Sequence, residues 1–207
     1  MHIYAFGSIC RGEIDRGSDV DMLIVSNGKQ HNINPSDYSI YSYERIDELW
    51  AQGNPFAWHL FLESKLVFSH DNSDYLLGLG KPNPYFSGRA DCIKFYEIFK
   101  SAELSLKQST LSQVFDLSSV FLAMRNFASC FSLAFLDCPN FSRRSSLKLG
   151  ELSVPIDSEV FEILENARIL CTRGIGLPPD ESQILMVIES LSEIENWMLL
   201  LMRRDHL

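Results

Sequence analysis

The sequence predicts an α+β fold in which a small sheet-containing unit is followed by a helical bundle. Short apolar runs of strand character are confined to residues 1–70, whereas residues 89–207 carry long segments with apolar side chains at helical spacing. Between them, residues 78–88 contain three glycines and two prolines, a composition typical of a linker. We therefore expect two domains, residues 1–77 and 89–207.

The expected sheet is built from four short segments with helices between them. Residues 8–13 have room only for a short helical turn before a polar loop. Residues 43–51 predict a helix, and a second helix starts at Asn54-Pro55, because Asn caps a helix well and Pro suits its first turn. We expect strands at residues 1–6, 20–25, 38–43 and 65–69.

The second domain is expected to be all helical. Two of its segments begin near an aspartate, at Asp157 and Asp180, and a carboxylate there stabilises the positive end of the helix dipole. The long second segment has room for a break. We expect helices at residues 91–106, 111–135, 157–171 and 180–202.

Composition limits the classes of partner. Hydrophobic residues make up 46% of the chain, as in a globular protein, and the net charge of −9 argues against a general nucleic-acid binder, because phosphate backbones require a basic surface. The five cysteines lack any Cys-x-x-Cys pair, which fits reduced thiols in a cytoplasm. The first strand starts near Met1, so we expect no signal peptide, and the apolar stretch 197–202 is too short to span a bilayer. We expect a cytoplasmic protein without a membrane partner.

The motif that carries chemistry surrounds the first two strands. Ten residues separate Gly7-Ser8 from Asp19-Val20-Asp21. Alternate side chains of a strand share a face, so Asp19 and Asp21 point the same way, and such a carboxylate pair suits a hard cation such as Mg²⁺. Gly7 lacks a Cβ and lets a phosphate approach the backbone, while the amides opening the turn at Ser8 supply donors. The motif indicates phosphoryl or nucleotidyl transfer.

This part of the chain resembles the signature of the DNA polymerase β-like nucleotidyltransferases, above all their minimal bacterial type. The resemblance rests on Gly7-Ser8, Arg11-Gly12-Glu13 and Ser18–Asp21, which an apolar strand follows. The resemblance implies a small mixed sheet in which Gly7 and Ser8 hold a nucleoside triphosphate and Asp19 and Asp21 hold two Mg²⁺ ions. A hydroxyl attacks the α-phosphorus, and pyrophosphate leaves. Arg11 either contacts a phosphate or pairs with an acidic neighbour.

The helical half resembles the bundle of kanamycin nucleotidyltransferase and the HEPN bundles that accompany minimal nucleotidyltransferases. HEPN ribonucleases carry an Arg followed four to six residues later by His, whereas Arg125-Asn126 is followed here by Cys130 and Phe131. Cysteine in an apolar helix does not serve as a general acid or base near neutral pH, so we do not expect a ribonuclease. The bundle is expected to wall an acceptor pocket or to mediate formation of a homodimer.

The family also places a third acid on the strand after Asp-x-Asp, and the segment 38–43 contains none. If Ile40 faces the core, strand parity puts Asp37, Ser39 and Tyr41 on the site face, and Asp37 becomes the candidate catalytic base. Otherwise the base must come from the helical domain, where the candidates are Glu97 and Glu103.

Two further histidines need an interpretation. His59 and Glu63 lie four residues apart on an expected helix, a spacing able to bind a metal, but the favoured interpretation is a half-buried histidine beside a surface glutamate. His70 follows the last expected strand and is interpreted as a loop residue.

These inferences converge on a Mg²⁺-dependent nucleotidyltransferase. It would move a nucleoside monophosphate from ATP or another triphosphate to a hydroxyl of a small molecule or a protein. The alternative is a nucleotide-binding or antitoxin-like regulatory module without turnover.

Overall fold

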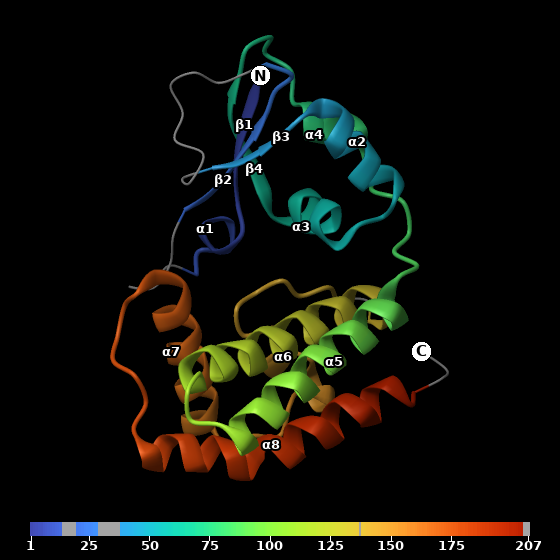
Figure 1. The fold of residues 1–207 in the computed structure, drawn as a ribbon. Helices are drawn as coiled ribbons and strands as arrows, with labels where there is room; N and C mark the ends of the chain where they lie inside the picture. Colours follow the sequence, from blue (N-terminus) through green and yellow to red (C-terminus); the bar gives the residue numbers. More distant parts are fainter. Residues whose placement is uncertain (14–19, 29–37, 137, 205–207) are drawn as a thin grey trace. The chain divides into compact units, whose positions relative to one another are not determined.

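The computed structural model describes residues 1–13, 20–28, 38–136 and 138–204, and the chain divides into two compact units, Met1–Phe86 and Ser87–Leu207. The first unit holds a small mixed sheet with helices, and the second is helical, so the fold class is α+β as predicted (Figure 1).

The sheet has the strand order β3-β2-β1-β4. β1 runs antiparallel to both β2 and β4, whereas β2 and β3 are parallel, which makes the sheet mixed. All four predicted strands are confirmed, each within two residues of its expected bounds. The strands are β1 (His2–Phe6), β2 (Asp21–Val25), β3 (Ser39–Tyr41) and β4 (Ser64–Ser69).

Helices pack against one face of this sheet and form the core of the first unit. Tyr4, Phe6, Leu23 and Val25 point to that face and are buried against apolar residues of α2, α3 and α4. The predicted start of α3 is confirmed, because the Asn54 side chain accepts a hydrogen bond from the amide of Phe56. The helices are α1 (Ser8–Arg11), α2 (Tyr43–Ala51), α3 (Pro55–Glu63) and α4 (Tyr75–Leu79).

The glycine- and proline-rich stretch is fixed to the first unit along part of its length. The indole N–H of Trp50 donates to the carbonyl of Gly80 at 2.9 Å, and that of Trp58 donates to the carbonyl of Asn83 at 3.0 Å. The side-chain amide of Asn83 in turn donates to the carbonyl of Ala51 at 2.7 Å. Residues 80–83 are therefore ordered against α2 and α3.

The second unit is organised around α6, which is buried along most of its length. Leu117, Met124 and Phe127 have no exposed surface, and α6 contacts α5, α7 and α8. The helix is unbroken, although the sequence left room for a break. The helices of the second unit are α5 (Gly88–Gln108), α6 (Gln113–Phe135), α7 (Ser158–Arg173) and α8 (Glu181–Met202), with short 3₁₀ turns at Ser145–Leu147 and Gly150–Leu152.

By length and composition, α6 is the one helix among the described residues that could cross a membrane. In the structure, however, 67% of its most apolar 18-residue window is buried against the rest of the chain. Such burial is typical of the core helix of a bundle, so the apolar character of α6 is weak evidence for a membrane partner.

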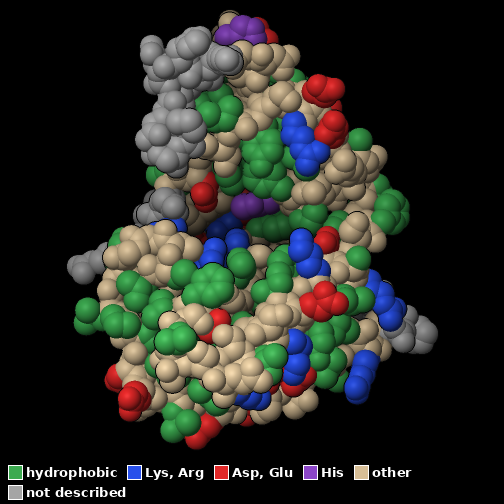
Figure 2. Space-filling model, viewed as in Figure 1, with side chains coloured by type: hydrophobic (Ala, Val, Ile, Leu, Met, Phe, Trp, Pro, Cys, Tyr) green, Lys and Arg blue, Asp and Glu red, His purple; other side chains and the backbone are tan. Residues whose placement is uncertain are grey.

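Buried carboxylates of the second unit are matched by partners. Glu103 is 5% exposed and pairs with Lys100 and with Lys107, the latter at 2.7 Å. Burial alone would raise the pKa of Glu103, but the hydrogen bonds and positive charges of the two lysines together outweigh burial and lower it. Acidic and basic side chains are interspersed over the visible face of this unit (Figure 2).

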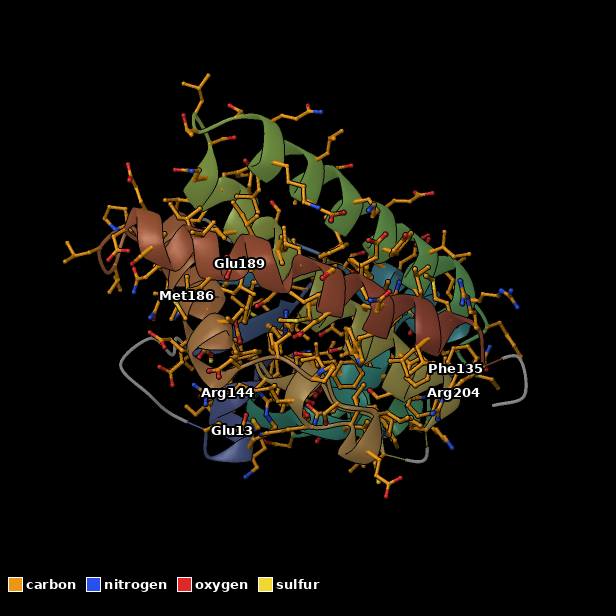
Figure 3. All side chains as sticks on the ribbon, turned by 90° about the horizontal axis from the view of Figure 1, so that it is seen from below. Glu13, Phe135, Arg144, Met186, Glu189 and Arg204 are labelled. Carbon is orange, nitrogen blue, oxygen red and sulfur yellow. The ribbon has the colours of Figure 1, made fainter. Side chains whose placement is uncertain are left out.

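A small cavity lies at the end of the bundle where α8 ends. Phe135 and Arg204 lie close together there (Figure 3) and line a cavity of about 100 Å³. Arg89 and Cys92 of α5 also line it, and burial strongly raises the pKa of the Cys92 thiol. Cys92 is therefore a neutral, inert part of the core.

Candidate functional site

The turn between β1 and α1 requires glycine at position 7 for two reasons. Gly7 has φ 75° and ψ −138°, a backbone conformation that side-chain-bearing residues rarely adopt. A Cβ at this position would also lie only 2.9 Å from Oδ2 of Asp21. The Gly7 amide donates to the carbonyl of Glu63 at 3.1 Å, which ties the turn to the end of α3.

Asp21 reaches this turn because of the strand register. It is the first residue of β2 and pairs with Phe6, the last residue of β1. Since paired residues share a face, the exposed Asp21 lies on the helix-covered side of the sheet together with the buried Phe6. The structure thus brings Gly7 and Asp21 together, while Asp19 lies outside the described residues.

Ser8 and Arg11 lie on α1, directly after Gly7. Both are partly buried. The Arg11 Nε–H donates to Glu13 at 2.8 Å, and its Nη1 pairs with Glu63. Arg11 therefore pairs with acidic neighbours, which is one of its two predicted roles. The phosphate-binding roles of Ser8 and Arg11 stay predictions. Burial raises the pKa of the neighbouring Cys10 thiol, which disfavours a nucleophilic thiolate at this turn.

His59 and Glu63 line the same turn from α3. His59 Nε2 lies 3.0 Å from Glu63 Oε2, and their side chains are only 15% and 14% exposed. The expected surface position of Glu63 is therefore wrong. The His59 and Phe6 rings form a T-shaped pair with centroids 5.6 Å apart, and His59 Cε1 lies 3.8 Å from the Cβ position of Gly7.

The spacing of His59 and Glu63 was visible in the sequence, but their position beside Gly7 was not. They reach it because α3 ends where β4 begins, and β4 pairs with β1 so that Ser64 lies opposite Phe6. Only this pairing between distant segments brings α3 to the turn.

The proposed third acid, Asp37, lies outside the described residues. The assumption used to place it is wrong, because Ile40 is 40% exposed whereas Tyr41 packs on Phe56, with ring centroids 5.5 Å apart. Ser39 pairs with Leu23, so Ser39 shares the face of Leu23 and Asp21. Of the alternative bases in the helical unit, Glu97 is exposed, and Glu103 is held by its two lysines.

The sequence motif that resembles the signature of nucleotidyltransferases lies at this turn, on a small mixed sheet. Comparison with protein families agrees: the model for the nucleotidyltransferase domain matches residues 2–77. This segment is a nucleotidyltransferase domain of the polymerase β-like superfamily. A search of curated proteins gave no significant match to the chain. The match supports nucleotidyl transfer as the general activity of the domain.

Proposed function

We propose that the protein is a cytoplasmic, Mg²⁺-dependent nucleotidyltransferase that uses ATP or another nucleoside triphosphate. It transfers the nucleoside monophosphate to a hydroxyl of a small molecule or a protein. The observation that carries the proposal is the close approach of the Gly7 backbone to the Asp21 carboxylate. A backbone that phosphates can approach thus lies beside an oxygen that can hold a metal.

The donor set at this turn fits a hard divalent cation. Asp21 is exposed, and Asp19 precedes it by two residues in the sequence, so the two carboxylates are the proposed oxygen ligands. When bound, the metal neutralises charge on the α-phosphate and on the leaving pyrophosphate. Asp19 and Asp21 would hold it.

The remaining residues position the substrates. Gly7 and Ser8 hold the phosphates through their backbone, and Arg11, oriented by Glu13 and Glu63, adds a positive charge. Asp37 accepts the proton of the attacking hydroxyl. We further propose a functional division into residues 1–77, which carry the transfer chemistry, and residues 89–207, which supply an acceptor wall or a homodimer surface.

The test is a survey of triphosphates. The full chain is incubated with each of the four ribonucleoside triphosphates and Mg²⁺, with and without cell extract, and pyrophosphate is measured. We expect release that requires Mg²⁺ and disappears in the Asp19→Ala plus Asp21→Ala variant, provided that circular dichroism shows both proteins folded.

A second measurement separates the proposal from its rival. Isothermal titration follows binding of each triphosphate in the presence of Mg²⁺. Binding without any pyrophosphate release would favour a non-catalytic regulator, and equal binding by the double variant would contradict the proposed metal site.

A further inference from the structure

A second cluster of metal-ligating side chains lies at the opposite end of β1 from Gly7. His2 pairs with Ser69, the last residue of β4, so the two residues that follow β4 lie next to His2. One ligand atom each from His2, His70 and Asp71 lies within 4.8 Å of the others. Figure 2 shows histidine atoms at the surface of the first unit at this N-terminal end of the sheet.

The separations within the cluster are close to those of a metal site. His2 Nε2 lies 3.3 Å from Asp71 Oδ1, and His70 Nε2 lies 3.8 Å from Asp71 Oδ2. Ligand atoms bound tetrahedrally to Zn²⁺ at about 2.0–2.2 Å are about 3.3–3.6 Å apart. All three ligand atoms lie within 4.8 Å of one another, and the exposed side chains of His70 and Asp71 can move to complete the geometry around the buried His2.

The other nitrogen of each ring is already engaged, as is usual for histidines that bind metals. His2 Nδ1 lies 2.7 Å from the Tyr43 hydroxyl, which can accept or donate and so suits either tautomer. His70 Nδ1 lies 3.3 Å from the Met1 carbonyl oxygen, to which it donates when Nε2 binds a metal; the Met1 ammonium, 2.7 Å from the same nitrogen, then turns away. These contacts turn both Nε2 atoms toward Asp71.

The carboxylate of Asp71 is also held in place. Its Oδ1 accepts hydrogen bonds from the Ser69 hydroxyl at 2.8 Å and from the Ser73 hydroxyl and amide at 2.7 and 3.0 Å. These bonds hold the pKa of Asp71 far below its usual range, so the group stays ionised. His2 is 3% exposed, whereas the side chains of Asp71 and His70 are 44% and 56% exposed, which leaves a path from solvent.

We propose that His2, His70 and Asp71 bind a divalent transition-metal ion of the Zn²⁺ class, with water completing the coordination. Imidazole nitrogens favour such ions over Mg²⁺, so the site would be chemically distinct from the carboxylate site beside Gly7. The ion replaces the 3.1 Å contact of His2 Nε2 with the Ser73 hydroxyl. It links the start of β1 to the connection between β4 and α4, and so stabilises the first unit.

The test uses the full chain freed of metal by a chelator and titrated with ZnCl₂ in excess Mg²⁺. We expect His70→Ala and Asp71→Asn each to weaken zinc binding by at least about tenfold, and Tyr43→Phe, which removes the partner of His2, by about tenfold. Asp21→Asn is the matched control, since it removes a carboxylate charge at the other end of the sheet, and it should leave zinc binding unchanged.

Two outcomes would overturn the proposal. One is the absence of zinc binding by the folded wild-type chain. The other is equal affinity of wild type, His70→Ala and Asp71→Asn, which would place the ion elsewhere, for example on exposed thiols such as Cys138 and Cys171. Co²⁺ substitution gives an independent measure, because thiolate ligands add an intense near-ultraviolet band that nitrogen and oxygen ligands lack.

Discussion

The two ends of β1 present different chemistry although they belong to one strand. At the Phe6 end, β1 meets the first residues of β2 and β4, and the groups gathered there are the Gly7 backbone and carboxylates. At the His2 end, it meets the last residues of the same two strands, and the donors are imidazoles with one carboxylate. The difference shows that antiparallel pairing places loops at both ends of the strands, and that each end can therefore carry its own set of ligands.

The two ends also differ in how their donors are held. At the His2 end the side chains fix one another through hydrogen bonds between His2 and the hydroxyls of Tyr43 and Ser73. At the Gly7 end the fixed element is backbone, anchored by the bond from the Gly7 amide to Glu63. We expect the first arrangement to favour tight static binding and the second to admit a large substrate.

The largest expected effect comes from removing a carboxylate at the Gly7 end. Asp21→Ala should lower Mg²⁺-dependent pyrophosphate release by about a thousandfold, because a metal contributes several kcal/mol to stabilising the charge that develops in the transition state. Activity and zinc binding are measured on the same preparation. Retention of more than a tenth of the activity would contradict the assignment of Asp21 as a metal ligand. Loss of zinc binding in the same variant would show that the two ends of β1 are not independent.

The second effect concerns stability at the His2 end. Zinc at a free concentration of about one hundred times its dissociation constant should stabilise the wild-type chain by about 2.7 kcal/mol. Thermal unfolding, followed by circular dichroism with and without zinc, should show this shift in wild type and in Asp21→Asn, and at most about half of it in Asp71→Asn, because tenfold weaker binding leaves about 1.4 kcal/mol. A shift of equal size in all three proteins would mean that zinc stabilises the chain from another place.

Much of the first unit could be predicted from sequence because its signals are local. Short apolar runs predicted β1 and β2, and the Asn54-Pro55 pair predicted the start of α3. The motif joining Gly7 to Asp21 was visible because the two residues lie on neighbouring elements. By contrast, α4 was missed, since it is only five residues long and contains Gly78, a poor helix former.

The features that sequence could not supply depend on pairing between distant segments. The cluster at His2 joins residues about seventy positions apart, and only the pairing of β1 with β4 brings them together. The predicted orientation of Ile40 was wrong for a related reason. β3 is three residues long, so its alternation is too short to identify the buried face, and the larger Tyr41 packs on Phe56 instead.

The third prediction separates two effects of a side chain at position 7: contact with the Asp21 carboxylate and strain of the backbone. Gly7→Ala should cost about 1–3 kcal/mol of stability and lower activity by about a hundredfold, because the new methyl group strains the turn and displaces the Asp21 carboxylate. Gly12 is the matched control: it has φ 73°, but no described atom lies within 4 Å of its Cβ position. Gly12→Ala should destabilise the chain by about 1–2 kcal/mol and change activity only a few-fold.

Urea unfolding and kcat/KM distinguish these two glycine variants. Equal loss of activity in both would show that backbone strain alone is responsible, and the argument from contact with Asp21 would fail. Zinc binding should be unaffected in both variants, because neither position touches the His2 end.

The smallest expected effect is that of Arg11→Gln, which tests whether Arg11 binds a phosphate of the triphosphate. Its pairs with Glu13 and Glu63 use Nε and Nη1, so Nη2 is the nitrogen to which a phosphate would bind. Arg11→Gln should then raise KM for the triphosphate about tenfold and leave kcat nearly unchanged, since one charge-assisted hydrogen bond contributes about 1.5–3 kcal/mol.

A double-mutant cycle with Glu63→Gln separates the two roles of Arg11. If the guanidinium contacts phosphate, Arg11→Gln raises KM to the same extent whether position 63 carries Glu or Gln. If Arg11 acts only by fixing Glu63 beside His59 and Gly7, its substitution has no further effect once Glu63 is replaced. We expect the first result, because Glu63 is already held by its position at the end of α3 and by the bond from the Gly7 amide to its carbonyl, neither of which needs Arg11.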